Sequence, residues 1–85
     1  MVVVIDVREP DEFSAGHVMG AKNIPLEQLV HTTVSNLELP LNSEIIVYCR
    51  SGARAGVAER SLREKGFTHV TNGIDQQTTE RLLDR

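Results

Sequence analysis

The sequence contains a single cysteine, Cys49, within the segment YCRSGARAG at residues 48–56. A thiol can act as a nucleophile, and its reactivity depends on how strongly its surroundings favour the thiolate. One cysteine cannot form an intramolecular disulfide and is too few for a thiolate zinc site, and His17, His31 and His69 show no metal-ligand spacing. We therefore expect nucleophilic chemistry at Cys49, with no metal and no cofactor.

The residues after the cysteine have the composition of an anion-binding turn: Arg50, Ser51, Gly52, Ala53 and Arg54. Gly52 permits backbone conformations in which successive N–H groups point inward, and a helix beginning near Arg54 adds free N–H groups and the positive end of its dipole. These groups favour the thiolate, so we expect a lowered pKa for Cys49. Arg50 and Arg54 suit the oxygens of a sulfonate, sulfate or phosphate.

The same residues also have a purely structural interpretation. A lone cysteine at the end of a strand is often a small buried hydrophobic residue. Arginines at the start of a helix are usually solvated, although the helix dipole disfavours cations there, and an anionic ligand would explain their position. Because the pattern Cys-x-x-Gly-x-Arg lies between a clear strand and a clear helix, we favour a functional loop.

Apolar runs predict the strands that position this loop. Residues 2–5 (VVVI) and 45–48 (IIVY) are continuously apolar, which is typical of strands covered on both faces of a parallel sheet. Residues 67–71 predict a third strand, and residues 23–25 predict a small extended segment. Ligands of open parallel sheets bind beyond the carboxyl ends of the strands, where Cys49 falls.

Helical signals alternate with the strands. A short helix is expected from Glu9 to near Gly16, another where apolar residues recur over residues 26–37, and a third over residues 54–65 that ends at Gly66. Asp75 is expected to cap a last helix. This succession predicts an α/β fold with a small parallel sheet.

Size and composition restrict the remaining possibilities. The 85 residues predict one domain, and 40% hydrophobic and 25% charged residues are typical of a globular protein. The net charge of −3 argues against general nucleic-acid binding, and no apolar run approaches the roughly 20 residues of a membrane helix. We expect a monomer that binds neither nucleic acid nor membrane. The expected compartment is the cytoplasm, or the periplasm if the chain is a processed mature form.

Three motifs in order carry a family resemblance: VIDVREPDEF at residues 4–13, GHVMGAKNIP at residues 16–25 and VYCRSGAR at residues 47–54. Together they resemble a rhodanese domain, from about residue 3 to residue 73. The short chain is most similar to the family's small single-domain thiosulfate sulfurtransferases. The resemblance implies a single rhodanese-like domain over residues 1–85, with three layers and a parallel sheet of about four strands.

The resemblance also implies a thiosulfate sulfurtransferase mechanism. The Cys49 thiolate would take the outer sulfur of a donor such as thiosulfate, release sulfite, and pass the resulting persulfide sulfur to cyanide, a thiol or an acceptor protein. The backbone N–H groups of residues 50–54 would stabilise the persulfide, and Arg50 and Arg54 would bind the sulfonate of the donor.

Asp6, Arg8 and His17 also match the family's motifs. We expect structural roles for all three. Asp6 and Arg8 follow a neighbouring strand, where an ion pair or hydrogen bonds would fix the shape of the active loop. His17 is expected to bond to backbone around the turn at Gly16 rather than act as a base.

Other functions remain open at this point. Cysteine-dependent phosphatases and some arsenate reductases use Cys-x5-Arg, whereas four residues separate Cys49 from Arg54 here, so we rank that chemistry lower. A non-catalytic persulfide carrier or a sulfur or redox sensor would need the same cysteine. The family's usual glycine pair is reduced to Asn72-Gly73-Ile74, so residues 74–85 have weak support from the resemblance.

Overall fold

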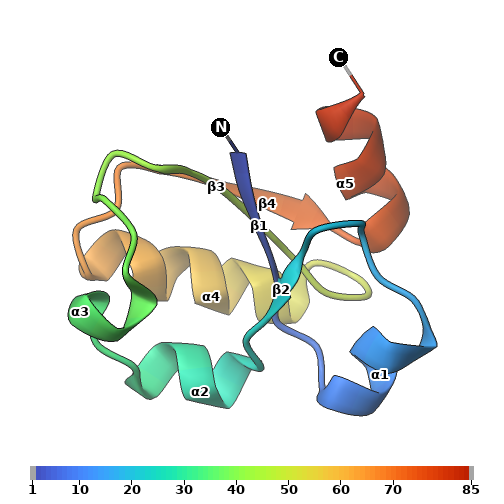
Figure 1. The fold of residues 1–85 in the computed structure, drawn as a ribbon, viewed down its shortest axis with the longest axis horizontal. Coiled ribbons are helices and arrows are strands. Elements are labelled where there is room, and N and C mark those ends of the chain that lie inside the picture. The colour runs from blue at the N-terminus through green and yellow to red at the C-terminus, as the bar shows by residue number, and fades with distance from the viewer. Residues whose placement is uncertain (1, 85) are drawn as a thin grey trace.

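The computed structural model describes residues 2–84 and contains a four-stranded parallel sheet in the order β2–β1–β3–β4 (Figure 1). The strands are β1 (Val2–Asp6), β2 (Lys22–Asn23), β3 (Glu44–Tyr48) and β4 (His69–Ile74). This confirms the α/β fold with about four parallel strands. The bounds predicted for the last strand are wrong, because β4 begins at His69 rather than Phe67 and continues past Thr71 to Ile74.

The carboxyl ends of the strands lie together at one edge of the sheet. Asp6 pairs with Asn23 on one side and with Tyr48 on the other, and Tyr48 also pairs with Ile74. Between β3 and β4 the register shifts after Val47, so Gly73 is the extra residue of a β-bulge. Cys49 therefore begins its loop at the edge where ligands of parallel sheets bind.

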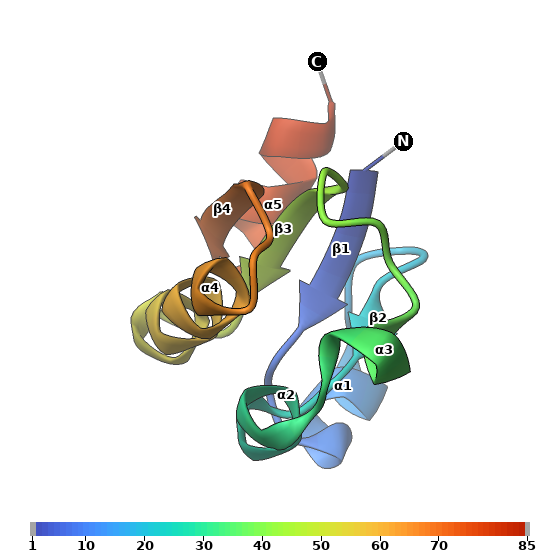
Figure 2. The ribbon, with the colours of Figure 1, turned by 90° about the vertical axis from the view of Figure 1, so that its left-hand side faces the viewer.

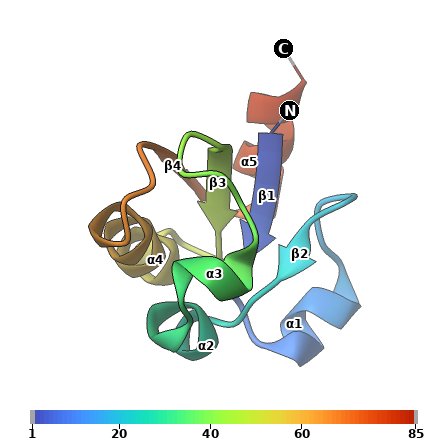
Figure 3. The same ribbon diagram turned by 60° about the vertical axis from the view of Figure 1, so that its left-hand side comes forward.

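Helices lie on both sides of the sheet, as Figures 2 and 3 show. The side that carries α4 (Ala53–Glu64) also carries α2 (Leu26–His31) and α3 (Val34–Leu37), and α2 packs on α4. On the opposite side, α5 (Gln76–Leu83) packs on β3 and β4, and α1 (Pro10–Ala15) follows β1. The two faces explain why β1 and β3 are apolar without alternation.

One helix predicted from the sequence is two helices in the structure. Thr32 and Thr33 have extended backbones, so α2 ends at His31 and α3 begins at Val34. The Thr33 hydroxyl caps α3 by accepting a hydrogen bond from the N–H of Asn36 at 3.1 Å. Two β-branched residues, the second of which is a favourable cap, therefore interrupt the helix, although the apolar pattern continues across them.

The main core lies between the sheet and the side that carries α4 and α2. Its buried members come from every element on that side: Ile5, Val7, Leu29, Leu37, Ile45, Val47, Cys49, Ala55, Ala58, Leu62, Phe67 and Val70. A smaller cluster of Val4, Val18 and Tyr48 lies on the opposite face. Because Ala55 and Cys49 belong to the same core, packing fixes the first turn of α4 against the end of β3.

Candidate active site

The loop between β3 and α4 wraps around the sulfur of Cys49. The Sγ atom accepts hydrogen bonds from the backbone N–H of Gly52 at 3.1 Å and of Ala55 at 3.4 Å. Gly52 is the N-cap of α4 and has a φ of 95°, a left-handed conformation that other residues resist. The glycine thus turns the chain so that N–H groups of the loop and of the first helical turn point at one atom.

These N–H groups control the ionisation of the thiol. Burial raises the pKa of Cys49, but backbone hydrogen bonds from Ala55, Ser51, Gly52 and Arg54 lower it, and the net effect is a pKa below the ordinary value of 9.0. Hydrogen bonds donated to a thiolate favour the charged form. The arrangement therefore favours a nucleophilic sulfur and can hold a second anionic atom attached to it.

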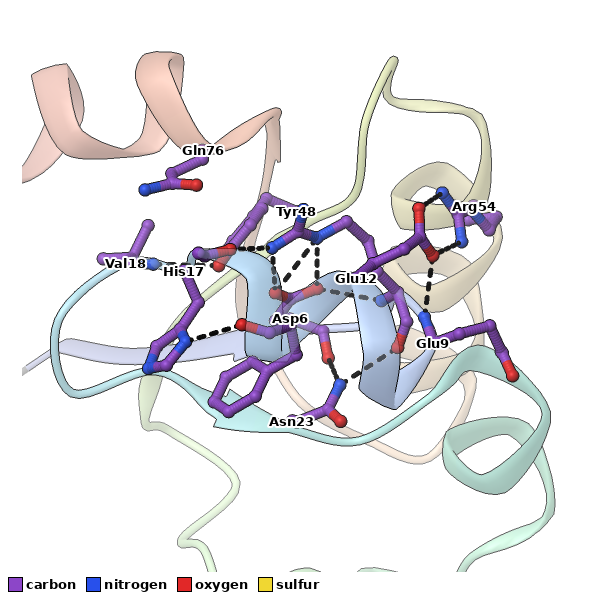
Figure 4. Close-up of polar contacts among 12 residues, drawn as sticks. Asp6, Glu9, Glu12, His17, Val18, Asn23, Tyr48, Arg54 and Gln76 are labelled. Atoms are coloured by element: carbon purple, nitrogen blue, oxygen red, sulfur yellow. Dashed lines mark hydrogen bonds and ion pairs between the residues drawn. The ribbon is translucent and has the colours of Figure 1, made fainter.

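The two arginines of the loop have different surroundings. Arg50 is exposed, and its side chain has no hydrogen bond or ion pair with residues 2–84. The guanidinium of Arg54 is bound by both carboxylate oxygens of Glu12 from α1, at 2.8 and 3.1 Å (Figure 4). The sequence predicted both arginines as anion ligands, and among residues 2–84 Arg54 has a carboxylate partner whereas Arg50 has none.

Asp6 and Arg8 form a buried pair at the end of β1. The Asp6 carboxylate is fully buried and accepts from Arg8 at the backbone N–H (2.9 Å), at Nε (3.0 Å) and at Nη2 (2.7 Å). Nη2 of Arg8 also donates to the carbonyl of Gly16 at 2.7 Å, and its guanidinium lies 5.4 Å from the centre of the Tyr48 ring. The pair thus joins β1 to the segment after α1 and to the residue before Cys49, without contacting Sγ.

His17 lies outside the loop. Its Nδ1 is 2.8 Å from the carbonyl oxygen of Phe13, and its ring stacks on the Phe13 ring with centroids 3.7 Å apart (Figure 4). The next residue, Val18, donates its N–H to the buried hydroxyl of Tyr48 at 3.0 Å. The sequence placed His17 in a backbone contact near Gly16, and the structure places it against the backbone of α1.

The end of β4 supports the loop in a way that sequence reasoning missed. The side-chain amide of Asn72 donates to the carbonyl of Gly52 at 3.0 Å and accepts from the N–H of Ile74 at 2.8 Å. The carbonyl of Ile74 in turn accepts the N–H of Cys49 at 3.1 Å. Asn-Gly directly after a predicted strand was the available signal, because the end of β4 must lie beside the end of β3.

Ile74 and Gly73 have unusual local geometry. Ile74 has a φ of 72°, which is strained for a β-branched residue and costs on the order of 1–3 kcal/mol. A Cβ on Gly73 would overlap Oγ1 of Thr79 and lie 2.8 Å from Ile46, so no side chain fits there. Contacts on both sides of Ile74 hold this strained segment beside Gly52.

Glu12 is the second residue that sequence reasoning missed. Arg54 binding and the N–H of Glu9 lower the pKa of Glu12 to about 2, so it is ionised at neutral pH. Its place in the VIDVREPDEF motif was visible, but its contact with a residue 42 positions later was not.

Within residues 2–84, no group of three or more His, Cys, Asp or Glu side chains is arranged to hold a metal ion. In the same residues, no helix has both the length and the apolar character needed to cross a membrane.

Comparison with known proteins gives a consistent result. The family model described as Rhodanese-like domain matches residues 1–75. The chain is 42% identical to the uncharacterized protein YqhL of Bacillus subtilis, over 81% of this chain and 52% of the relative. It is 41% identical to the thiosulfate sulfurtransferase PspE of Escherichia coli, over 80% of this chain and 64% of the relative. The matches thus span only about half to two thirds of these relatives.

Solved structures agree with the fold. A structure described as a rhodanese with anions from E. coli superposes with a TM-score of 0.82 at 35% identity, covering 92% of this chain and 91% of the other. The Rhodanese_3 like domain of the Alr3790 protein from Anabaena sp. gives a TM-score of 0.80 at 28% identity, covering 98% of this chain and 93% of the other.

Proposed function

This chain belongs to the rhodanese-like domain family, and from that premise we propose that it is a sulfurtransferase in which Cys49 carries the transferred sulfur. Relatives described as sulfurtransferases from E. coli and Allochromatium vinosum support sulfur transfer in general. The observation that carries the assignment to Cys49 is the set of backbone N–H groups directed at its Sγ atom. No other part of the described chain offers a thiol.

The first half of the reaction loads the cysteine. The Cys49 thiolate attacks the outer sulfur of a donor such as thiosulfate, a bond forms between Sγ and that sulfur, and the sulfur–sulfur bond of the donor breaks. Its electron pair leaves with sulfite, and Cys49 holds a persulfide. The backbone N–H groups of residues 51–55 stabilise the negative charge on the persulfide, and the exposed Arg50 attracts the donor's sulfonate oxygens.

The second half of the reaction transfers the persulfide sulfur from Cys49 to an acceptor. A nucleophilic acceptor such as cyanide or a thiol attacks the outer sulfur of the persulfide, and the electron pair of the broken sulfur–sulfur bond returns to Sγ as the thiolate. The low pKa of Cys49 makes that thiolate a good leaving group. No general base is needed for either half, which agrees with the position of His17 away from the loop.

The remaining predicted site residues act through the loop's shape. Asp6 and Arg8 hold the end of β1 against Tyr48, the residue that precedes Cys49. We assign them a supporting role, because the Asp6 carboxylate accepts hydrogen bonds from Arg8, and Arg8 also donates to the carbonyl of Gly16.

Phosphatase chemistry fits the loop less well. A phosphatase needs a guanidinium free to bind the phosphate oxygens, whereas Arg54 is bound by Glu12, and four residues rather than five separate it from the cysteine. The spacing and the occupied guanidinium together favour a sulfur on Cys49 over a phosphate around it.

The test is to incubate the protein with thiosulfate and to measure its intact mass. We expect one added sulfur atom that dithiothreitol removes, and no such adduct on Cys49→Ser. No adduct on the wild type, or the same adduct on the variant, would reject the proposal. Cys49-dependent hydrolysis of an aryl phosphate faster than thiosulfate turnover would favour the phosphatase. A persulfide that forms but is not discharged by small acceptors would favour a carrier role.

A further inference from the structure

The ion pair between Arg54 and Glu12 bears on which sulfur donors the loop accepts. Both oxygens of Glu12 contact the guanidinium, at 2.8 and 3.1 Å, and both side chains are partly buried, with 34% of Arg54 and 22% of Glu12 exposed. A bidentate pair of this kind is stronger and better oriented than a single surface contact. The donor therefore meets an arginine whose charge is already balanced.

Glu12 is held in place from its own helix as well. Its Oε1 accepts the backbone N–H of Glu9 at 2.9 Å, in the reciprocal capping box that begins α1. The carboxylate is therefore fixed by two elements, as Figure 4 shows. A donor that displaces it from Arg54 must therefore break two hydrogen bonds of a carboxylate that is also held from its own helix.

The pair lies at the loop that holds the reacting sulfur. The backbone N–H of Arg54 is among the groups that lower the pKa of Cys49. The pKa of the Arg54 guanidinium is raised chiefly by Glu12, and also by the negative charges of Cys49 and Glu9. The negative charge of Glu12 thus lies against an arginine that also interacts with the charge of Cys49, the group that an anionic donor must approach.

We propose that Glu12 is a specificity-determining residue that disfavours doubly charged donors such as thiosulfate relative to donors with one negative charge, such as thiosulfonates. The inference rests on sulfur transfer at Cys49. With a thiosulfonate, the thiolate attacks the outer sulfur, the sulfur–sulfur bond breaks, and a sulfinate leaves with the electron pair. The charge balance matches that of the thiosulfate reaction, in which sulfite leaves.

The experiment compares thiosulfate, a dianion, with benzenethiosulfonate, a monoanion, and uses cyanide as acceptor. Glu12→Gln removes the charge but keeps an oxygen to accept the N–H of Glu9. We expect kcat/KM for thiosulfate to rise roughly three- to tenfold and that for benzenethiosulfonate roughly two- to threefold, because the Coulomb term scales with donor charge. Both increases should shrink at high salt.

Glu59→Gln is the matched control. It also removes a carboxylate paired with an arginine, at 3.3 Å from Arg63 on the same helix as Arg54, and should leave kcat/KM for both donors nearly unchanged. Equal effects of the two variants, an unchanged Glu12→Gln, or a fall for both donors would overturn the inference. A fall would mean that Glu12 instead holds Arg54 in a required orientation.

A second measurement needs only the wild type. If the charge of Glu12 repels anionic donors, raising the salt concentration should increase the ratio of kcat/KM for thiosulfate to kcat/KM for benzenethiosulfonate. A decreased or constant ratio overturns the inference. Failure of the proposed function would look different, because neither donor would then add a sulfur atom to Cys49 when the intact mass is measured.

Discussion

At the scale of single residues, the reactivity of Cys49 is a balance between burial and hydrogen bonds. The residue is 2% exposed, and burial opposes the thiolate. Backbone N–H groups of the loop and of the first turn of α4 outweigh that penalty. It matters that these hydrogen-bond donors belong to the backbone, because their positions are fixed by the fold and not by the choice of side chain.

The balance predicts the pH dependence of alkylation. Because the pKa of Cys49 is lowered by folding, the rate of reaction with iodoacetamide should rise and level off at a lower pH in the folded protein than in the urea-unfolded chain. The thiolate is correspondingly a stabilising form: its contribution is present in full above the unfolded pKa and is lost as the pH falls through the folded pKa. An alkylation midpoint at or above that of the unfolded chain would show that burial dominates.

At the scale of elements, the loop depends on β4 as much as on β3 and α4. Asn72 joins the carbonyl of Gly52 to the N–H of Ile74, and Ile74 holds the N–H of Cys49. The end of one strand thus supports the loop that follows its neighbour. The β-bulge at Gly73 makes this geometry available by shifting the register next to Tyr48.

Asn72→Asp should weaken the site without removing any group that contacts Sγ. The change replaces the N–H donor to Gly52 with an oxygen, which repels the Gly52 carbonyl and adds a negative charge near the thiolate. We expect a higher alkylation midpoint for Cys49 and persulfide formation from thiosulfate slowed roughly tenfold, corresponding to about 1.4 kcal/mol. Asn42→Asp, on an exposed turn, makes the same chemical change as a control. If both variants behave alike, Asn72 does not position the loop.

Local sequence patterns predicted the elements whose signals are local. The strands at VVVI and IIVY, the helix after the cysteine and the Asp75 cap of α5 lie as expected, the cap with a 2.7 Å contact to the N–H of Thr78. The extension of β4 through Asn72 and Gly73 could not be predicted, because these residues favour turns and pairing with β3 decides their conformation. The same limit explains why the loop was predicted but its contacts with Glu12 and Asn72 were not.

At the scale of the whole molecule, the two faces of the sheet are packed unequally. The α4 side holds twelve buried residues in one cluster, whereas the buried cluster on the opposite face consists of Val4, Val18 and Tyr48. The hydrophobic free energy of folding therefore depends chiefly on the side of the sheet that carries α4, the helix that also supplies an N–H group to Cys49. Stability and the shape of the site have a common origin in the packing of α4.

Leu62→Ala tests that dependence on α4. Leu62 is fully buried on α4, and truncating such a residue removes apolar contacts and leaves a cavity, which costs about 3 kcal/mol. For a domain of this size the melting temperature should fall by roughly 12–24 °C. Leu83→Ala at the end of α5, where the residue is 39% exposed, makes the same truncation and should cost less than about 1 kcal/mol. Urea unfolding of both variants measures the difference in free energy of unfolding. Equal losses would mean that the face covered by α5 contributes as much as the α4 side, and that the site is not tied to the dominant core.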